Sequence, residues 1–193
     1  MEEMAAEYPD VVFLHCSGYK SNDSNYTNYF GKIYEARYLS GLAAGSLTES
    51  NKIGYVAAFP IPEVIRGINA FAVGVKEVNP NATVEVVWTN TWFGPEEETQ
   101  AANALLEAGA DVLTQHQDSA STGIAAEAAG AKWIGYHTGY GQDAAPNAFV
   151  TAPVWNWGPL YTEMVNAVIN DEFTTTPYWT GMSGNVVDLF EVS

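Results

Sequence analysis

The stretch that decides the fold is residues 51–74, NKIGYVAAFPIPEVIRGINAFAVG. It opens with a short apolar run at residues 53–59, which is typical of a buried parallel strand. Pro60 and Pro62 end that strand because proline has no N–H for a sheet ladder, and Pro62 suits the first turn of a helix. Apolar residues then recur at three- and four-residue steps, as on one face of a helix. The stretch therefore predicts a strand, a tight turn and a helix, with the turn at the sheet edge where ligands bind in open α/β folds.

The same alternation continues to residue 136. We expect strands at residues 83–90, 111–116 and 132–136, with helices between them that stop at Gly109 and Gly130. Glu96, Glu97 and Glu98 favour a solvated first helical turn, because acids stabilise the positive end of the helix dipole. Asp118 and Ser119 are typical N-cap residues for the Ala-rich helix that follows them. Regular alternation predicts an α/β fold in which helices cover both faces of a parallel sheet.

The flanking segments are less regular. Residues 11–16 predict a strand, and residues 17–28 a polar loop with an aromatic tail at Tyr26, Tyr29 and Phe30. A helix of small residues is expected over 33–44, followed by a polar connector at 47–51 that suits a domain boundary. Residues 149–152 predict another short strand and residues 161–169 a helix. Residues 173–193 are expected to form hairpin or edge strands.

Composition excludes several classes of protein. The net charge is −16, from 23 acidic and 7 basic residues, so a nucleic-acid partner or an anionic membrane surface is not expected. Cys16 is the single cysteine, which excludes an internal disulfide or a zinc quartet. No apolar run approaches the ~20 residues that span a bilayer. The acidic start, MEEMAAEYPD, has no signal-peptide pattern. We expect the chain to be a fragment that lacks both ends of its protein.

The usual signatures of catalysis are missing. The sequence has no GxGxxG after a strand and no GxxxxGK[ST], GxSxG or HExxH motif, and residues 139–141 are too short for a phosphate loop. His116, Asp118 and His137 end strands at one predicted edge, but their spacing favours helix capping or ligand hydrogen bonds over metal binding. We expect no catalytic residues, no metal and no cofactor.

Aromatic residues are the unusual feature of this sequence. Six tryptophans and eleven tyrosines are present, and several aromatic residues stand at predicted strand ends or turns. These are Phe59, Trp92, Phe93, Trp155 and Trp157. They either cap the core, as loop aromatics often do, or stack on a flat, uncharged ligand. Nearby polar side chains, His116 and Asp118 among them, suit the hydrogen-bonding groups of a heterocycle.

Four motifs resemble the basic membrane protein family, the solute-binding proteins of ABC transporters that include purine-nucleoside receptors. They are the run of residues 51–80, VVWTNTWFGPEEETQAA at 86–102, GADVLTQHQDS at 109–119 and TAPVWNWGPLYTEMV at 151–165. The resemblance covers nearly the whole chain. The segments NTWF, QH-x-DS and APxWNWGP are similar to the branch associated with adenine or related purines.

The resemblance implies a type I periplasmic-binding-protein fold, in which two Rossmann-like lobes close on a ligand. Residues 1–50 would be the last part of the first lobe, 51–152 the second lobe, and 153–193 the crossover helix and the return. The implied ligand-binding residues are Phe59, Glu63, Trp92, Phe93, His116, Asp118, Trp155 and Trp157, with Tyr26 from the first lobe. Where other branches often carry an acid, this sequence has Trp92 and Phe93.

The resemblance also implies a function. It predicts an exported periplasmic or cell-surface lipoprotein that binds a purine base or nucleoside and docks on a membrane permease. Two other classes stay open from the residues alone. One is the ligand-sensing domain of a regulator, because this fold is reused in that way. The other is a nucleoside-cleaving hydrolase, for which Asp118 is the only well-placed acid.

Overall fold

The computed structural model describes residues 1–191, and the chain forms two compact units. Unit 1 comprises Met1–Lys32 and Trp155–Val187, and unit 2 comprises Ile33–Val154 with the segment that starts at Asp188. The expected boundary near residue 50 differs from this division, which assigns residues 33–50 to unit 2. Each unit is described by itself below.

Unit 2 is built on a five-stranded sheet. Its strands are β3 (Lys52–Ala57), β4 (Thr83–Trp88), β5 (Val112–His116), β6 (Lys132–Ile134) and β7 (Phe149–Thr151). They lie in the order β4-β3-β5-β6-β7, and every neighbouring pair is parallel. This confirms the parallel sheet predicted from the alternating pattern. The strand order reverses between β3 and β5, and such a switch point opens a crevice at the carboxyl ends of the strands.

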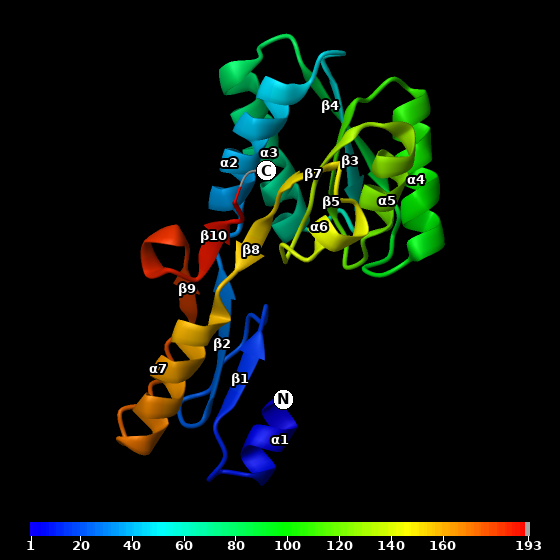
Figure 1. Cartoon of the computed structure of the whole chain (residues 1–193). Coiled ribbons are helices and arrows are strands. Elements are labelled where there is room, and N and C mark those ends of the chain that lie inside the picture. The colour runs from blue at the N-terminus through cyan, green and yellow to red at the C-terminus, as the bar shows by residue number, and fades with distance from the viewer. Residues whose placement is uncertain (192–193) are drawn as a thin grey trace. The chain divides into compact units, whose positions relative to one another are not determined.

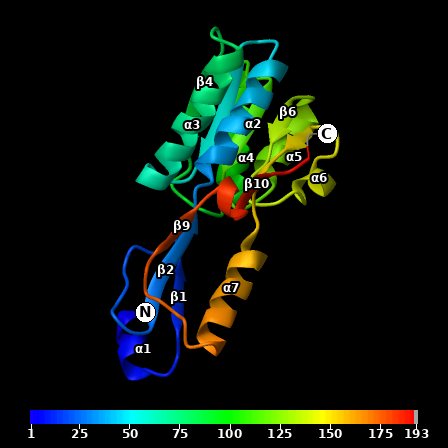
Figure 2. The same cartoon turned by 90° about the vertical axis from the view of Figure 1, so that its left-hand side faces the viewer.

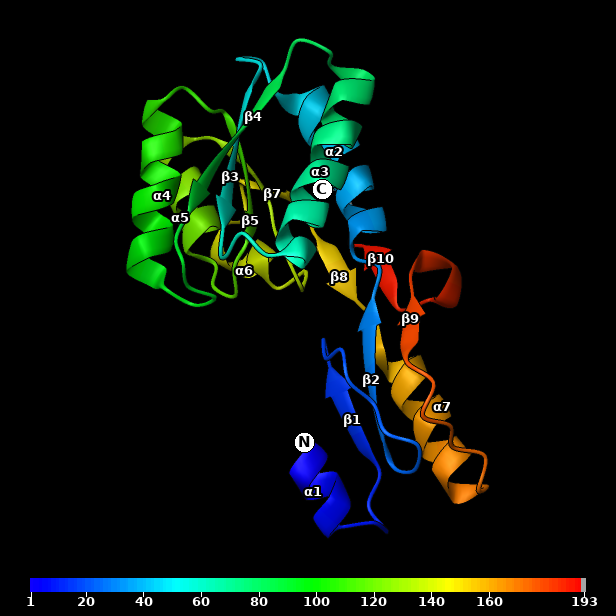
Figure 3. The same ribbon diagram turned by 180° about the vertical axis from the view of Figure 1, so that it is seen from behind.

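Helices cover both faces of this sheet (Figure 1). On one face lie α2 (Tyr34–Leu47) and α3 (Pro62–Val78), and on the other lie α4 (Pro95–Glu107) and α5 (Ser121–Ala129); the view from behind shows the same layers (Figure 3). A short helix, α6 (Gly141–Ala144), precedes β7. Two buried clusters correspond to the two faces. One contains Phe71 and Val75 from α3, and the other contains Leu105 and Trp133.

The helices α2 and α3 lie side by side (Figure 2). Glycines line their contact, because a Cβ on Gly41 would lie 2.2 Å from the Phe71 carbonyl oxygen and one on Gly74 would lie 2.1 Å from the Tyr38 carbonyl oxygen. Only glycine, whose side chain is a single hydrogen atom, allows the two backbones to approach so closely. This contact explains why α2 groups with unit 2.

Unit 1 contains a three-stranded sheet of order β1-β2-β9, with all pairs parallel. Its elements are α1 (Glu2–Glu7), β1 (Phe13–Cys16), β2 (Tyr26–Gly31), α7 (Trp157–Ile169), β9 (Tyr178–Thr180) and the 3-10 turn Met182–Gly184. A separate pair consists of β8 (Pro153–Trp155) and β10 (Val187–Leu189). Residues 173–191 therefore contribute edge strands, as expected, but pair with β2 and β8 and not with each other. Residues 192 and 193 lie outside the described part.

Three local expectations are wrong. The aromatic tail of the expected loop is strand β2, because Tyr26 and Tyr29 pair with β1 and leave the polar residues before them as the loop. The helix α5 begins at Ser121 with Ala120, and not Asp118 or Ser119, at its N-cap position, although Ser119 Oγ accepts from the Ser121 amide at 3.2 Å. Glu98 is not solvated: its side chain is fully buried, accepts from the Gly94 amide at 3.1 Å, and accepts from the Ser119 hydroxyl.

Candidate functional site

A line of rings follows the carboxyl edge of the unit 2 sheet. The centroid of Phe59, after β3, lies 5.3 Å from that of Trp92, after β4. Trp92 lies 6.0 Å from His116 at the end of β5, which lies 4.4 Å from Tyr136 after β6. Tyr136 then contacts His137 with their centroids 3.7 Å apart. We call these five residues the ring line. Because parallel strands end at one edge, residues far apart in the sequence meet there.

An acid closes one end of the ring line. Asp118 Oδ1 lies 2.8 Å from His137 Nε2, and both side chains are partly exposed. Beside this pair is a pocket of about 230 Å³, lined from β5 and β6, the loops that follow them, and the start of α6. Asp118, Tyr136 and His137 line it together with Gln115, Gln117, Ser119, Ala120, Trp133, Thr138, Tyr140 and Gly141. The pocket combines ring faces with a carboxylate, which is the chemistry of a site for a polar, flat molecule.

Gln117 holds the loops that carry this site. With its amide oriented to satisfy all its partners, its nitrogen donates to the Thr91 and Trp92 carbonyl oxygens at 3.0 and 2.9 Å. Its oxygen accepts from the Thr89 hydroxyl at 2.6 Å. The Asp118 amide also donates to the Trp92 carbonyl, at 3.0 Å. The loop after β4 is therefore tied to the end of β5, which fixes the position of Trp92 relative to Asp118.

The centre of the ring line is buried and neutral. His116 is 4% exposed, and burial, together with the charge of Arg37, holds the pKa of its imidazole well below the ordinary value. Its Nε2 lies 3.0 Å from the Tyr136 hydroxyl. Burial also raises the pKa of Tyr136. Neutral rings at this position suit stacking and hydrogen bonding, and they do not provide a charged general acid or base near pH 7.

Two predicted site residues of unit 2 are not members of the ring line. Glu63 is in the first turn of α3, where Oε2 lies 3.3 Å from a guanidinium nitrogen of Arg66. Burial raises the pKa of the Glu63 carboxyl against the opposing charges of Arg66 and Arg37. Phe93 is 64% exposed and has no ring neighbour within the described residues, in contrast to Trp92 beside it.

The remaining predicted site residues belong to unit 1. Trp155 and Trp157 stack on each other with centroids 4.8 Å apart, and Phe30 packs 4.8 Å from Trp155. Tyr26 is only 2% exposed, and its hydroxyl lies 3.2 Å from His15 Nδ1. The three predicted residues of unit 1 thus contact other rings of the same unit, which is what packing in the core would give. A role in ligand binding stays a prediction for them.

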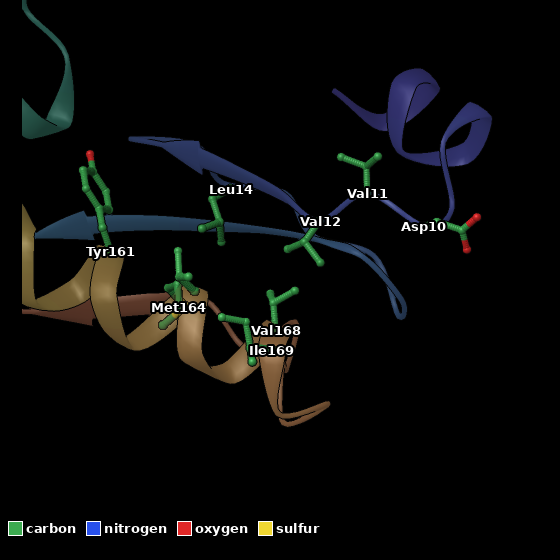
Figure 4. A pocket seen from close by; sticks show the side chains of 9 residues that line it. Asp10, Val11, Val12, Leu14, Tyr161, Met164, Val168 and Ile169 are labelled. Atoms are coloured by element: carbon green, nitrogen blue, oxygen red, sulfur yellow. The ribbon is translucent and has the colours of Figure 1, made fainter.

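Unit 1 has an apolar groove between β1 and α7 (Figure 4). Its volume is about 520 Å³, and it is lined by Asp10, Val11, Val12, Leu14, Tyr161, Met164, Val165, Val168 and Ile169. The Tyr161 hydroxyl already bonds to that of Tyr29 at 2.9 Å, which leaves Asp10 as the other polar group of the lining. A solute site needs several convergent polar groups, so the groove is a weaker candidate than the ring line.

Sequence reasoning missed part of the site. Strand position placed His137 at the same edge as His116, but neither Tyr136 nor His137 was among the predicted ligand-binding residues. Arg37, which is fully buried beside Tyr136, was hidden in a helix of small residues, where a lone basic residue was the available signal. Within residues 1–191, no group of three or more His, Cys, Asp or Glu side chains could hold a metal ion.

Comparison with known proteins identifies the family. All 193 residues match the Bmp family, described as ABC transporter substrate-binding protein PnrA-like. The chain therefore belongs to this family, which consists of solute-binding proteins and not of enzymes. The resemblance read from the four motifs is confirmed. Within the described residues, no helix combines the length and the apolar character needed to cross a bilayer.

Two curated relatives carry different descriptions. A putative ABC transporter glucose-binding protein of Haloferax volcanii is 44% identical over 191 residues, which are 99% of this chain and 48% of that protein. A purine-binding protein of Brucella abortus is 37% identical over 187 residues, which are 97% of this chain and 53% of that protein. The chain thus spans about half the length of the curated relatives it matches.

A solved structure supports the fold. The ABC transporter solute-binding protein of Conexibacter woesei aligns with a TM-score of 0.79 over 99% of this chain and 64% of that one, at 24% identity. At this identity the likeness establishes the fold alone. It confirms the expected α/β architecture of the type I periplasmic-binding-protein kind.

Proposed function

We propose that this chain is part of the substrate-binding component of an ABC importer, and that its solute stacks on the ring line of unit 2. The proposed solute is a purine base or nucleoside. The proposed partner is a membrane permease, and the proposed location is outside the cytoplasmic membrane, as a periplasmic protein or a surface lipoprotein. The observation that carries the proposal is the ring line itself, which ends at Asp118 beside a pocket.

The chemistry of the ring line favours a flat solute. Trp92 is 40% exposed, and Gln117 holds its backbone carbonyl, so the indole offers a ring face from an anchored loop. Asp118 is an acceptor that suits the exocyclic amine of a purine or the hydroxyls of a ribose. The purine-binding relative from Brucella supports this choice.

A monosaccharide is the second candidate, because the Haloferax relative is described as a putative glucose-binding protein. A sugar also stacks its apolar face on tryptophan and donates hydroxyls to a carboxylate. The two candidates differ in what each side chain contributes, since a purine depends more on the ring face and a sugar more on several hydrogen bonds.

Calorimetry on the full-length protein tests the proposal directly. Adenine, adenosine, guanosine and glucose are titrated in turn, and we expect heat with at least one purine and none with glucose. Trp92→Ala should weaken purine binding by about 5- to 150-fold, because stacking on one aromatic side chain contributes about 1–3 kcal/mol. Asp118→Asn should change the preference among purines more than the stacking.

Tyr19→Ala is the matched control, because Tyr19 is an aromatic residue of unit 1 that is 86% exposed. The Tyr19→Ala protein should bind the purine with the same affinity as the unchanged protein. If only glucose gives heat, the solute is a sugar and not a purine. If none of the four compounds gives heat, the result counts against transport of either class. Release of the purine unchanged separates binding from nucleoside cleavage. The gene sequence upstream of this region separates a receptor, with a lipidated cysteine after a signal, from a regulator with a DNA-binding domain.

A further inference from the structure

The side chain of Gln115 binds the loop that carries Asp118 on both sides of that residue in the sequence. Gln115 is in β5 and is 2% exposed. Its Nε2 donates to the Gln117 carbonyl oxygen at 3.1 Å and to the Ser119 carbonyl oxygen at 2.5 Å. These two carbonyls belong to the residues directly before and after Asp118. One buried amide therefore holds the backbone on each side of the carboxylate.

The indole of Trp133 fixes the orientation of this amide. Trp133 Nε1 donates to Gln115 Oε1 at 3.1 Å, and both side chains are buried. An indole N–H is a donor only, so it must meet the oxygen of the amide and not its nitrogen. Both hydrogens of the amide nitrogen are then directed at the two loop carbonyls. A buried polar group with all its donors satisfied has one favoured arrangement, which makes it a rigid support for the loop.

A second buried side chain holds the same loop through Ser119. The Ser119 hydroxyl donates to Glu98 Oε2, and Glu98 Oε1 accepts from the Gly94 amide at 3.1 Å. Glu98 is in the first turns of α4, which follows the loop that carries Trp92. Ser119 is thus bound at its carbonyl by β5 and at its hydroxyl by α4. The backbone around Asp118 therefore has fixed partners in the absence of a solute.

The contact that the Asp118 side chain itself makes is exposed. Its Oδ1 lies 2.8 Å from His137 Nε2, with 45% of the Asp118 side chain and 37% of the His137 side chain exposed. A pair this exposed contributes little, because water competes for both groups. The position of the carboxylate is therefore set mainly by the buried hydrogen bonds to the residues on either side of it.

We propose that Gln115 is a positioning residue of the solute site: it holds residues 117–119 so that the Asp118 carboxylate is in place before the solute arrives. Both donors of Gln115 are used by protein carbonyls, so it acts through Asp118 and not as a donor to the solute. Support of this kind raises affinity, because the loop does not have to be ordered on binding. The inference rests on the proposed function, in which Asp118 binds the solute.

Gln115→Met is the direct test, because methionine is of similar length and has no amide. The carbonyls of Gln117 and Ser119 then lose their common donor. In the full-length protein, calorimetry should show adenosine binding about tenfold more weakly, which is the loss of one hydrogen bond of about 1.4 kcal/mol. Without solute, the imidazole NMR signals of His137 should also change, because Asp118 is bonded to this ring. These signals are identified by their loss in His137→Gln.

Thr114→Val is the matched control for lost stability. Thr114 precedes Gln115 in β5, is fully buried, and donates its hydroxyl to the Ile134 carbonyl oxygen at 3.1 Å. Neighbouring side chains of a strand face opposite sides of the sheet, so this variant loses a buried hydrogen bond and none to the loop. Urea unfolding should show a less stable protein. Its adenosine affinity and its His137 signals should be unchanged.

Gln115→Glu is a second variant that keeps the size of the side chain and the acceptor for Trp133. A carboxyl group has at most one hydrogen to donate, so only one of the two loop carbonyls can be bound. The loss of adenosine affinity and the change in the His137 signals should be smaller than in Gln115→Met. If Gln115→Met does not fold, Gln115→Glu takes its place.

The proposal is overturned if either Gln115 variant folds with unchanged His137 signals, or if Thr114→Val changes these signals as much. Changed signals with unchanged adenosine affinity would also overturn it, since Gln115 would then have no role in solute binding. If the unchanged protein does not bind adenosine, that solute is wrong. The His137 signals, which are measured without solute, then decide by themselves whether Gln115 positions Asp118.

Discussion

The glycine contact between α2 and α3 leads to a prediction in which one substitution, made twice in one helix, has opposite effects. Gly67→Ala and Gly74→Ala both place a methyl group on α3, and both gain the same helix propensity of about 0.5–1 kcal/mol. They differ in what the methyl group meets. At Gly67 the nearest atom is 3.7 Å away, whereas at Gly74 the Tyr38 carbonyl oxygen is 2.1 Å away and the Leu42 amide nitrogen 3.0 Å away.

The expected free energies follow from these contacts. At Gly74 the approach is more than an ångström below an ordinary contact, which begins near 3.4 Å. Because the obstructing atoms are backbone, the helices must separate, and overpacking of this kind costs about 1–3 kcal/mol or more. Gly74→Ala should therefore lower the free energy of unfolding by about 1–2 kcal/mol after the propensity gain, while Gly67→Ala should raise it by about 0.5–1 kcal/mol.

Urea unfolding followed by far-UV circular dichroism measures both variants. The two variants should differ in their free energy of unfolding by about 1.5–3 kcal/mol, which is above the error of the method. Equal stabilities within about 0.5 kcal/mol would refute the close backbone approach of α2 and α3.

Two further predictions concern charge. The pKa of His116 is lowered in the folded chain, so below about pH 6.5 the unfolded chain binds a proton that the native chain does not. The free energy of unfolding should therefore fall as the pH drops below about 6.5, by up to about 1.4 kcal/mol per pH unit. Urea titrations at several pH values measure this slope, and His116→Gln should remove the part that is due to His116. Asp111 accepts from the Thr48 hydroxyl at 2.6 Å and from the Glu49 and Ser50 amides at 2.7 Å, so Asp111→Asn should destabilise unit 2 by about 1.5–3 kcal/mol. In the same assay the exposed Asp143→Asn should change little, and equal losses in the two variants would contradict the role of Asp111.

The sheet of unit 2 was predictable because its signals are local. The apolar run before Pro60 and the proline at the start of α3 mark one strand and one helix. The same alternation of strand and helix signals continues through β4, β5 and β6. The strand β3 is buried by helices on both sides, so an apolar run without alternation identifies it, whereas the edge strand β4 begins with alternating exposed and half-buried residues. Errors occurred where tertiary contacts override local preference. Glu98 was expected in solvent, yet Ser119 and the Gly94 amide bind it in the interior.

The candidate site was predictable to a lesser degree. Strand ends alone placed Phe59, Trp92 and His116 at one edge, since the carboxyl ends of parallel strands share that edge. The same rule does not say which of two adjacent aromatics turns inward, and Trp92 and Phe93 differ in this respect. Nor does it reveal Arg37, whose position beside Tyr136 depends on the close approach of α2 to α3 and on the packing of both against the sheet.

The strand pairing of unit 1 has a consequence for the order of events during synthesis. Tyr29 of β2 pairs with Tyr178 of β9, and the whole sheet of unit 2 is encoded between them. As the ribosome advances, strands β3 to β7 emerge consecutively and can assemble before β9 has been translated. Until then one edge of β2 has no partner, and exposed strand edges favour pairing with other chains. Slow translation of residues 155–178 should therefore reduce the yield of native protein more than an equal delay within unit 2.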